Sequence, residues 1–262
     1  MSERGEPFVS IIIPAYNEAR RIDASITALD TFLASVSWSH EVILVVEKSA
    51  DGTLELARRL AEGKPWLCVI GHDVQRGKGY AVRTGMIRAR GELAFFMDAD
   101  LSTPLAEIGR FIARFSSAPP VDVLVGNRQH ARSEILTQQH FLRRKMGQTF
   151  NAILRMIAGI RLADTQCGFK AFRRAARAAI FPLQKLDGFA FDVEVILLAE
   201  RLGFAIEDMP VHWSNAEGSK VRIIRDSWRM LCDAIRVRRL VAGTLAKRNA
   251  GIETPAHRGG AS

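Results

Sequence analysis

The sequence predicts an α/β protein, in which a mostly parallel sheet is covered by helices on both faces. Short, continuously apolar runs alternate with helical patterns through the first half of the chain. Runs of this kind are typical of parallel strands that are buried on both faces. Polar residues follow several of the runs, where the strands should end. The 262 residues, 48% of them hydrophobic and 25% charged, suffice for one large α/β domain with a full core.

Five strands and four helices are predicted in the first half. The strands are expected at residues 8–14, 41–47, 66–73, 92–100 and 121–128. The helices are expected at residues 19–35, 53–63, 77–91 and 103–117, and Gly91 should end the third of them. Each apolar run is short enough for a strand. Each helical segment is long enough to form the crossover between two parallel strands.

The second half is less regular. Helical periodicity occurs at residues 141–160, 189–203 and 221–240, and residues 205–213 resemble a strand. Residues 163–174, read "ADTQCGFKAFRR", are interpreted as a polar loop. We expect one domain over residues 1–245, followed by a disordered tail at 246–262, which is rich in Gly, Ala and Arg.

Composition excludes several classes of protein. The three cysteines have no metal-ligand spacing, which favours a reduced compartment, and no two of the six histidines stand at helix spacing. The first ten residues contain no apolar signal core, and no run approaches the ~18 apolar residues of a membrane span. We therefore expect a cytoplasmic protein that does not cross the bilayer.

Positive charge is concentrated near the C-terminus. The formal net charge is +9, and the stretch from Lys220 onward holds ten Lys and Arg against three Asp and Glu. Such a basic surface favours nucleic acid, acidic lipid headgroups or phosphorylated substrates as partners. Within this stretch, residues 222–239 can form a basic amphipathic helix, which either lies in a membrane interface or packs on the core.

Asp98 and Asp100 follow the apolar run "AFFM" and flank a single alanine. If strand geometry persists, both carboxylates emerge on the same face. Two nearby anions repel each other unless a cation lies between them, and Mg²⁺ usually takes one or two carboxylates plus phosphate oxygens. The alternative is an Asp-rich turn before a helix, with Ser102 or Thr103 as N-cap and Pro104 at the first helical position.

Several other polar segments follow predicted strands. These are the turn from Pro14 to Glu18, Glu47 and Arg128. In parallel sheets ligands bind beyond the carboxyl ends of the strands, so these residues predict a binding edge. The segment "RGKGYAVRTG" lacks the third glycine of a dinucleotide fingerprint and the Ser or Thr of a Walker loop. It forms either a tight turn before a helix or a phosphate contact through Lys78.

A set of motifs in fixed order resembles the family 2 glycosyltransferases of the GT-A fold, especially the polyprenyl-phosphate glycosyltransferases such as the dolichyl-phosphate glucosyl and mannosyl enzymes. The resemblance covers about Phe8 to Arg238, and its "DTQCGFK" loop looks more like the glucosyl branch. The motifs are "VSIIIPAYNE", "DGT", "RGKGYAVRTGM", "FFMDADLSTP", "VGNR", "DTQCGFKAF" and "GFAFDVEVILLAERLG".

The resemblance implies a nucleotide-sugar half at about 8–130 and an acceptor half at about 131–245. It implies that the aspartate pair Asp98 and Asp100 holds Mg²⁺ or Mn²⁺ on a sugar diphosphate, with Ala99 between them at the donor site. It also implies donor contacts by Pro14, Ala15, Tyr16, Glu18, Val45, Glu47, Lys78 and Lys220, and a phosphate-facing Arg128. One departure is that the family's Asp-Asp-Gly-Ser is replaced by Val46-Glu47-Lys48-Ser49, which leaves the identity of the base open.

The expected reaction is inverting transfer of a hexose, glucose from UDP-glucose before mannose from GDP-mannose, onto a polyprenyl phosphate at the cytoplasmic face of an anionic membrane. A phosphate monoester is mostly dianionic at neutral pH, so it needs cations such as Arg128, Arg143 and Arg144 rather than a general base. A hydroxyl acceptor would instead require a base, for which Asp164 or Asp192 is the candidate. A nucleic-acid-binding module is not expected, because it leaves the paired aspartates unexplained and aromatic residues are only 8%.

Overall fold

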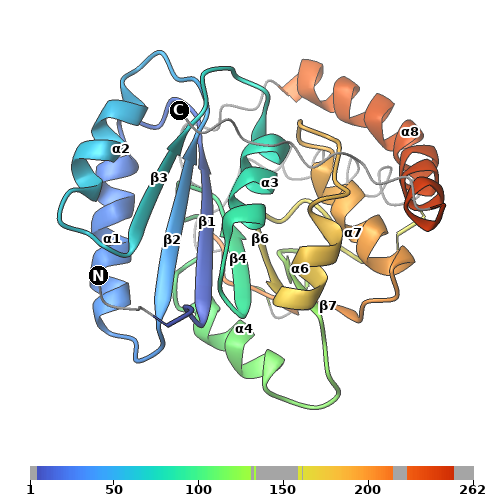
Figure 1. The fold of residues 1–262 in the computed structure, drawn as a ribbon, viewed down its shortest axis with the longest axis horizontal. Helices are drawn as coiled ribbons and strands as arrows, with labels where there is room; N and C mark the ends of the chain where they lie inside the picture. Colours follow the sequence, from blue (N-terminus) through green and yellow to red (C-terminus); the bar gives the residue numbers. More distant parts are fainter. Residues whose placement is uncertain (1–4, 131–132, 134–158, 161, 215–222, 251–262) are drawn as a thin grey trace.

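A seven-stranded sheet forms the centre of the computed structural model (Figure 1). The structure describes residues 5–130, 133, 159–160, 162–214 and 223–250. The strand order is β3-β2-β1-β4-β6-β5-β7, and every pairing is parallel except those of β6 with β4 and β5. This arrangement confirms the predicted mostly parallel α/β fold.

Both halves of the chain contribute strands to this sheet. The strands are β1 (Val9–Ala15), β2 (His40–Val46), β3 (Leu67–Gly71), β4 (Leu93–Met97), β5 (Val123–Asn127), β6 (Phe169–Arg173) and β7 (Ile206–Pro210). The helices are α1 (Ile22–Ala34), α2 (Thr53–Ala61), α3 (Lys78–Arg88), α4 (Glu107–Phe115), α6 (Arg174–Ile180), α7 (Phe191–Arg201) and α8 (Ile223–Asn249). The strands and helices predicted for the first half are thereby confirmed. The domain boundaries stay a prediction.

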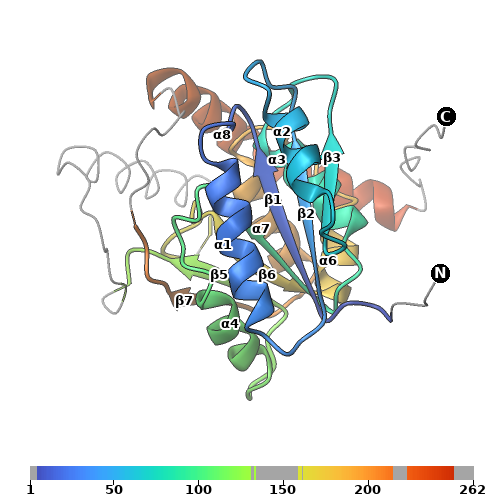
Figure 2. The same cartoon turned by 90° about the vertical axis from the view of Figure 1, so that its left-hand side faces the viewer.

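Each face of the sheet carries its own hydrophobic core. Successive side chains of a strand point to opposite faces, so Ile11 and Ile13 join one cluster while Ile12 joins the other. Helices α1, α2 and α4 cover the first cluster, and α3, α6, α7 and α8 cover the second. In Figure 2, α1 lies in front of the strands and α7 behind them.

Helix α3 packs close to the sheet because it carries Gly85. A Cβ atom at this position would collide with the side chain of Ile12 on β1. The close contact places the first residue of α3, Lys78, at the carboxyl edge of the sheet, near the end of β4. The position of this glycine therefore contributes directly to the position of a charged side chain.

The interpretation of residues 163–174 as a loop holds for residues 163–168 but was wrong for the rest. Phe169–Arg173 form β6, which lies antiparallel between β4 and β5 and pairs Phe169 with Met97. Its lysine, Lys170, is fully buried, which an apolar-run criterion does not anticipate. A buried lysine becomes acceptable only because Asp192, from α7, lies 2.6 Å from its ammonium group.

The end of β4 also differs from the expectation. The strand stops at Met97, so strand geometry does not extend through Asp100, and Leu101 has a positive φ of 50°. Helix α4 begins at Glu107 rather than at Pro104. Ser102 does not cap that helix, since its hydroxyl donates to Asp100 at 2.7 Å. The predicted strand geometry through Asp100 and the predicted N-cap at Ser102 or Thr103 were therefore wrong, whereas the metal site stays a prediction.

Other predictions fall at or beyond the limits of the described residues. Helix α8 continues to Asn249, so the first four residues of the predicted disordered tail are helical. Of the helix predicted at 141–160, only the last two residues are described. Arg143, Arg144 and Lys220 lie outside the described residues. None of the helices in the described part is long and apolar enough to cross a membrane.

Candidate active site

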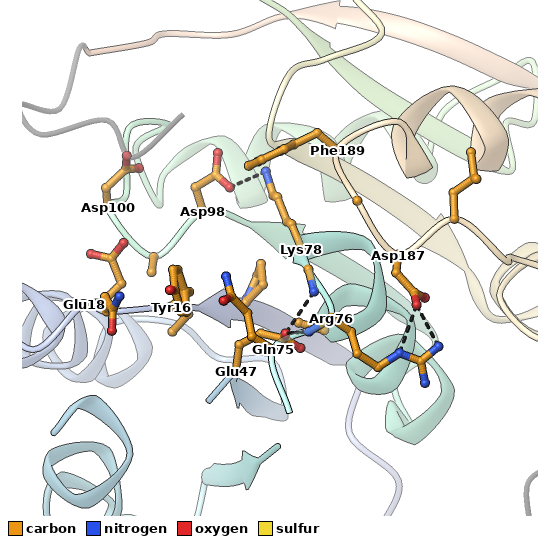
Figure 3. Close-up of a pocket in the computed structure, with 18 of the residues that line it drawn as sticks. Tyr16, Glu18, Glu47, Gln75, Arg76, Lys78, Asp98, Asp100, Asp187 and Phe189 are labelled. Carbon is orange, nitrogen blue, oxygen red and sulfur yellow. Dashed lines mark hydrogen bonds and ion pairs between the residues drawn. The ribbon is translucent and has the colours of Figure 1, made fainter. Parts of the chain in front are cut away.

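A cavity of about 1100 Å³ opens at the carboxyl edge of the sheet (Figure 3). It brings together the turn after β1, the end of β4, the start of α3 and a loop before α7. Nine predicted donor-site residues line it: Pro14, Ala15, Tyr16, Glu18, Glu47, Lys78, Asp98, Ala99 and Asp100. Its volume lies just above the range of about 300–1,000 Å³ that is typical of small-molecule sites.

The turn after β1 is fixed by the segment that contains the "DGT" motif. Thr53 Oγ1 accepts the amide of Glu18 at 2.8 Å, and Asp51 accepts the amide of Ala19 at 3.0 Å. Burial raises the pKa of Asp51, but hydrogen bonds from Thr53 and Ala19 outweigh it and hold the pKa below its usual value. The "DGT" motif therefore positions the cavity wall, although the cavity lining does not include it.

Glu47 anchors the turn that precedes α3. Its buried carboxylate lies 2.8 Å from His72 Nδ1 and accepts the amides of Arg76 at 2.5 Å and Gly77 at 2.9 Å. The longer side chain, compared with the aspartate usual in the resembling family, is thus engaged by the protein itself. Val45 is fully buried in the hydrophobic core and is not part of the lining, so its donor contact stays a prediction.

Lys78 and Asp98 form the central ion pair of the cavity, with 2.6 Å between Nζ and Oδ1 (Figure 3). Burial lowers the pKa of Lys78, but the charges of Asp98, Asp192 and Asp100 outweigh burial and raise it, so the side chain is an ammonium. Asp100 is held by Ser102, whose amide and hydroxyl donate to Oδ1 at 3.0 and 2.7 Å. Its other oxygen, Oδ2, is 4.0 Å from Arg21.

The loop that precedes α7 forms a wall that the sequence analysis missed. Arg76 donates two hydrogen bonds to Asp187, and Phe189 also lines the cavity. Buried Glu194 accepts the amides of Lys185 and Leu186 at 2.9 and 2.7 Å and so holds the loop from below. The Asp-Gly pair at 187–188 indicates a turn, but no sequence signal places that turn beside Arg76, 111 residues earlier.

Two ion pairs, each with a buried aspartate, lie next to the cavity. Arg128 makes a bidentate contact with Asp164 at 2.8 and 3.0 Å, and Lys170 contacts Asp192 at 2.6 Å. Burial raises the pKa of Asp164, but the charge and hydrogen bonds of Arg128 outweigh it and hold the pKa below its usual value. Burial also raises the pKa of Asp192, and here Lys170 offsets the effect only in part. Neither aspartate nor Arg128 belongs to the cavity lining.

The residues present fit a hard divalent cation that is completed by other ligands. Asp98 and Asp100 supply carboxylate oxygens, and Ser102 orients Asp100 as outer-shell partners of metal ligands do. Within the described ranges, no group of three or more His, Cys, Asp or Glu residues could hold a metal ion. Magnesium commonly takes only one or two carboxylates and fills its other positions with water and substrate phosphates.

A mostly parallel sheet with one antiparallel strand, and a carboxylate pair just after a strand beside a large cavity, are the features expected of a nucleotide-sugar-dependent transferase of the GT-A type. Comparison of the sequence with protein families gives the same result. The model described as glycosyl transferase family 2 matches residues 10–181. The chain therefore belongs to glycosyltransferase family 2.

Characterised relatives cover most of the chain. The dolichyl-phosphate beta-glucosyltransferase of Saccharomyces cerevisiae is 33% identical over 250 residues, which cover 89% of this chain and 75% of the yeast protein. The enzyme of the same name from Dictyostelium discoideum is 31% identical over 241 residues, which cover 88% and 74% of the two chains.

Solved structures share the fold at low sequence identity. The glucosyl-3-phosphoglycerate synthase of Mycobacterium tuberculosis, solved with Mn²⁺, UDP-glucose and phosphoglyceric acid, has a TM-score of 0.65 and 18% identity, covering 88% of this chain and 79% of that one. The mannosyl-3-phosphoglycerate synthase of Rubrobacter xylanophilus has a TM-score of 0.62 and 19% identity, covering 95% and 77%. At these identities the likeness establishes the fold alone.

Proposed function

We propose that this protein transfers glucose from UDP-glucose to a polyprenyl phosphate with inversion at the anomeric carbon. The observation that carries the proposal is the meeting of Asp98, Asp100 and Lys78 in one cavity at the carboxyl edge of the sheet. The names of the relatives, which are dolichyl-phosphate beta-glucosyltransferases over most of this chain, support both the sugar and the acceptor.

On the donor side, each wall of the cavity has a distinct role. The turn from Pro14 to Glu18 and the turn anchored by Glu47 would enclose the nucleotide, while Lys78 would contact a phosphate oxygen. Asp98 and Asp100 would hold Mg²⁺ or Mn²⁺, which neutralises the negative charge that develops on the departing diphosphate. The structural neighbour solved with Mn²⁺ and UDP-glucose supports this choice of donor and metal.

On the acceptor side, the buried ion pairs favour a phosphate over a hydroxyl. A general base must reach the acceptor and exchange a proton with it. Asp164 and Asp192 are both buried and each carboxylate is held by a cation, so neither is accessible enough to serve as that base. A phosphate monoester needs no such base, since its second pKa is about 6. Arg128, which is 30% exposed, is the described cation proposed to position it.

We also propose reversible attachment to an anionic membrane surface through α8. Several exposed basic side chains follow one another along this helix, and exposed Ile235 immediately precedes the first of these basic residues. They are Arg236, Arg238, Arg239, Lys247 and Arg248. A polyprenyl phosphate is confined to a membrane, so an enzyme that uses it benefits from electrostatic attraction to that surface, worth about 1 kcal/mol for each basic residue near it.

The test is a transfer assay with UDP-glucose, GDP-mannose and other nucleotide sugars, each with Mg²⁺ or Mn²⁺. Polyprenyl phosphate and the corresponding free polyprenol serve as matched acceptors that differ only in the phosphate. We expect transfer from UDP-glucose to polyprenyl phosphate and no comparable transfer to polyprenol. Equal transfer to polyprenol would favour a hydroxyl acceptor, and preference for GDP-mannose would replace the proposed donor.

A further inference from the structure

Lys78 forms an ion pair with Asp98, a carboxylate that the proposed function assigns to a metal. Its ammonium lies 2.6 Å from Asp98 Oδ1, with the lysine side chain 19% and the aspartate side chain 39% exposed. A full ion pair at this distance satisfies the charge of Asp98 in the ligand-free protein. A divalent cation that approached Asp98 would meet a fixed positive charge beside it and would be repelled.

The Asp98 carboxylate is confined on one side by the backbone. Its second oxygen, Oδ2, rests against the backbone at Gly168, where not even a Cβ atom would fit. Lys78, in contrast, is the first residue of α3 and has a flexible four-carbon side chain. Its ammonium can therefore move without moving the helix. If a metal binds at Asp98, the lysine is the group that must leave.

Two protein carboxylates alone also make a weak metal site. Among the described residues no third His, Cys, Asp or Glu joins Asp98 and Asp100 in a group that could hold a metal. One of these two carboxylates is already neutralised by Lys78. A diphosphate would change both conditions at once, because its oxygens add metal ligands and offer Lys78 a new anionic partner.

We infer that Lys78 is an internal counter-ion that blocks the metal position in the free protein and exchanges Asp98 for a diphosphate oxygen when metal and nucleotide bind together. This inference rests on the proposed function of the same cavity. It predicts that metal alone binds weakly, and that metal and nucleotide each strengthen the binding of the other, as thermodynamic linkage requires.

The test measures Mn²⁺ binding to the full chain without nucleotide, from the electron paramagnetic resonance signal of free Mn²⁺. Lys78→Met removes the competing charge at similar length, and we expect it to bind Mn²⁺ at least tenfold more tightly than the wild type. Lys185→Met is the matched control, because Lys185 also lines the cavity but forms no described ion pair with Asp98. We expect its Mn²⁺ affinity to stay within about twofold of the wild type.

A second measurement follows UDP binding by calorimetry at saturating Mn²⁺. Here Lys78→Met should bind UDP at least tenfold more weakly, so one substitution improves metal binding and impairs nucleotide binding. Lys78→Gln, which keeps a polar side chain, should show the same two opposite changes and serves if Lys78→Met does not fold. Circular dichroism and thermal unfolding verify that each variant is folded.

The outcomes separate this inference from the proposed function. Unchanged Mn²⁺ affinity in the folded Lys78 variants, or an equal gain in Lys185→Met, overturns the counter-ion role while Mn²⁺-dependent UDP binding by the wild type still supports the function. Absence of Mn²⁺-dependent UDP binding in the wild type overturns both. Opposite changes in the Lys78 variants alone support the exchange.

Discussion

The carboxylate of Asp98 lies directly against Gly168, where a Cβ atom would collide with Oδ2. These two residues are brought together by the antiparallel pairing of β6 with β4, which sets Phe169 opposite Met97. The glycine in the "CGF" segment therefore leaves the space that Asp98 occupies at the cavity. The relationship connects a residue outside the predicted site to the orientation of a residue within it.

Gly168→Ala should disable the enzyme without unfolding it. The added methyl group must displace the Asp98 carboxylate, and misplacing a group at a reacting centre by about 1 Å can cost roughly 10²-fold in rate. We expect transfer to fall by about that factor, measured with the proposed donor and acceptor, while the thermal unfolding midpoint changes little.

The control is Gly109→Ala, at a position in α4 where an added Cβ meets no atom within 4 Å. Alanine is favoured over glycine within a helix by roughly 0.5–1 kcal/mol, so this variant should be slightly more stable and fully active. Wild-type activity in folded Gly168→Ala would show that Asp98 tolerates displacement.

Asp100→Asn should abolish transfer, and Ser102→Ala should reduce it less. Asparagine removes a charge from the proposed metal site, whereas loss of the Ser102 hydroxyl removes one hydrogen bond of 2.7 Å that orients Asp100. Outer-shell partners of this kind typically contribute 10- to 100-fold to metal affinity or activity, so we expect a decrease of about tenfold for Ser102→Ala. Rates measured across a series of Mn²⁺ concentrations check both variants.

Excess metal should restore part of the Ser102→Ala activity, because the site is weakened rather than removed, and should not restore Asp100→Asn. Ser116→Ala, an exposed serine just after α4, is the control and should match the wild type. Full activity of Asp100→Asn, or of the wild type in excess chelator, would exclude the proposed metal role.

Removing the charge of Asp192 from the buried Lys170–Asp192 ion pair should destabilise the fold. Lys170 is fully buried, and its ammonium also donates to the carbonyl of Cys167 at 2.7 Å. Asp192→Asn leaves that charge buried without a counter-ion, and removing one partner of such a pair typically costs about 3–5 kcal/mol. Urea unfolding measures this loss of stability.

The double variant Lys170→Met/Asp192→Asn should recover much of that loss, because no unpaired charge remains. In a double-mutant cycle the two substitutions should therefore be strongly non-additive. Additive effects would mean that the two side chains do not stabilise each other. The folded double variant also tests catalysis, since retained transfer to polyprenyl phosphate excludes Asp192 as a general base.

Glu194 should make stability depend on pH. Burial raises the pKa of this carboxyl to about 7. The amides of Leu186 and Lys185 and the charges of Arg83 and Lys185 lower the pKa, but burial outweighs them. Folded protein thus keeps the proton up to about pH 7, while unfolded protein loses it near the usual value of 4.5. Between these values the folded state binds more protons, so its stability falls as pH rises, by up to about 1.4 kcal/mol per pH unit.

Glu194→Gln cannot ionise, so the stability of the wild type relative to this variant should fall as pH rises from 5 to 7. Chemical unfolding at several pH values gives the difference. Glu55→Gln, which changes an exposed carboxylate on α2, should retain the wild-type pH dependence. Parallel curves for wild type and Glu194→Gln would contradict the raised pKa.

Arg236→Gln/Arg239→Gln should weaken membrane attachment. At about 1 kcal/mol per basic residue, the loss of two charges corresponds to roughly 30-fold weaker partitioning onto anionic vesicles. Vesicle flotation measures it, and added salt should reduce wild-type binding by screening. Arg58→Gln/Arg59→Gln, two exposed arginines on α2, is the control and should bind like the wild type. Equal losses in both pairs would argue against α8 as the attachment surface.

The sequence alone determined the alternating elements of the first half and most of the donor wall. These features are local, because apolar periodicity specifies a buried strand and polar residues just after it lie at a common edge of a parallel sheet. Pro14 to Glu18, Lys78 and Asp98 to Asp100 were predicted in this way or by resemblance to the family, and the structure brings all of them to one cavity.

Only the tertiary structure decided which charged side chains form pairs within the protein. Glu47 was predicted as a donor contact, and the fold shows that its carboxylate is engaged with His72 and the turn before α3. The loop around Asp187 forms a cavity wall because it packs against Arg76. Strand β6 was missed because a buried lysine is stable only beside Asp192, 22 residues further along the chain. Contacts between distant segments depend on packing in three dimensions, which local periodicity does not encode.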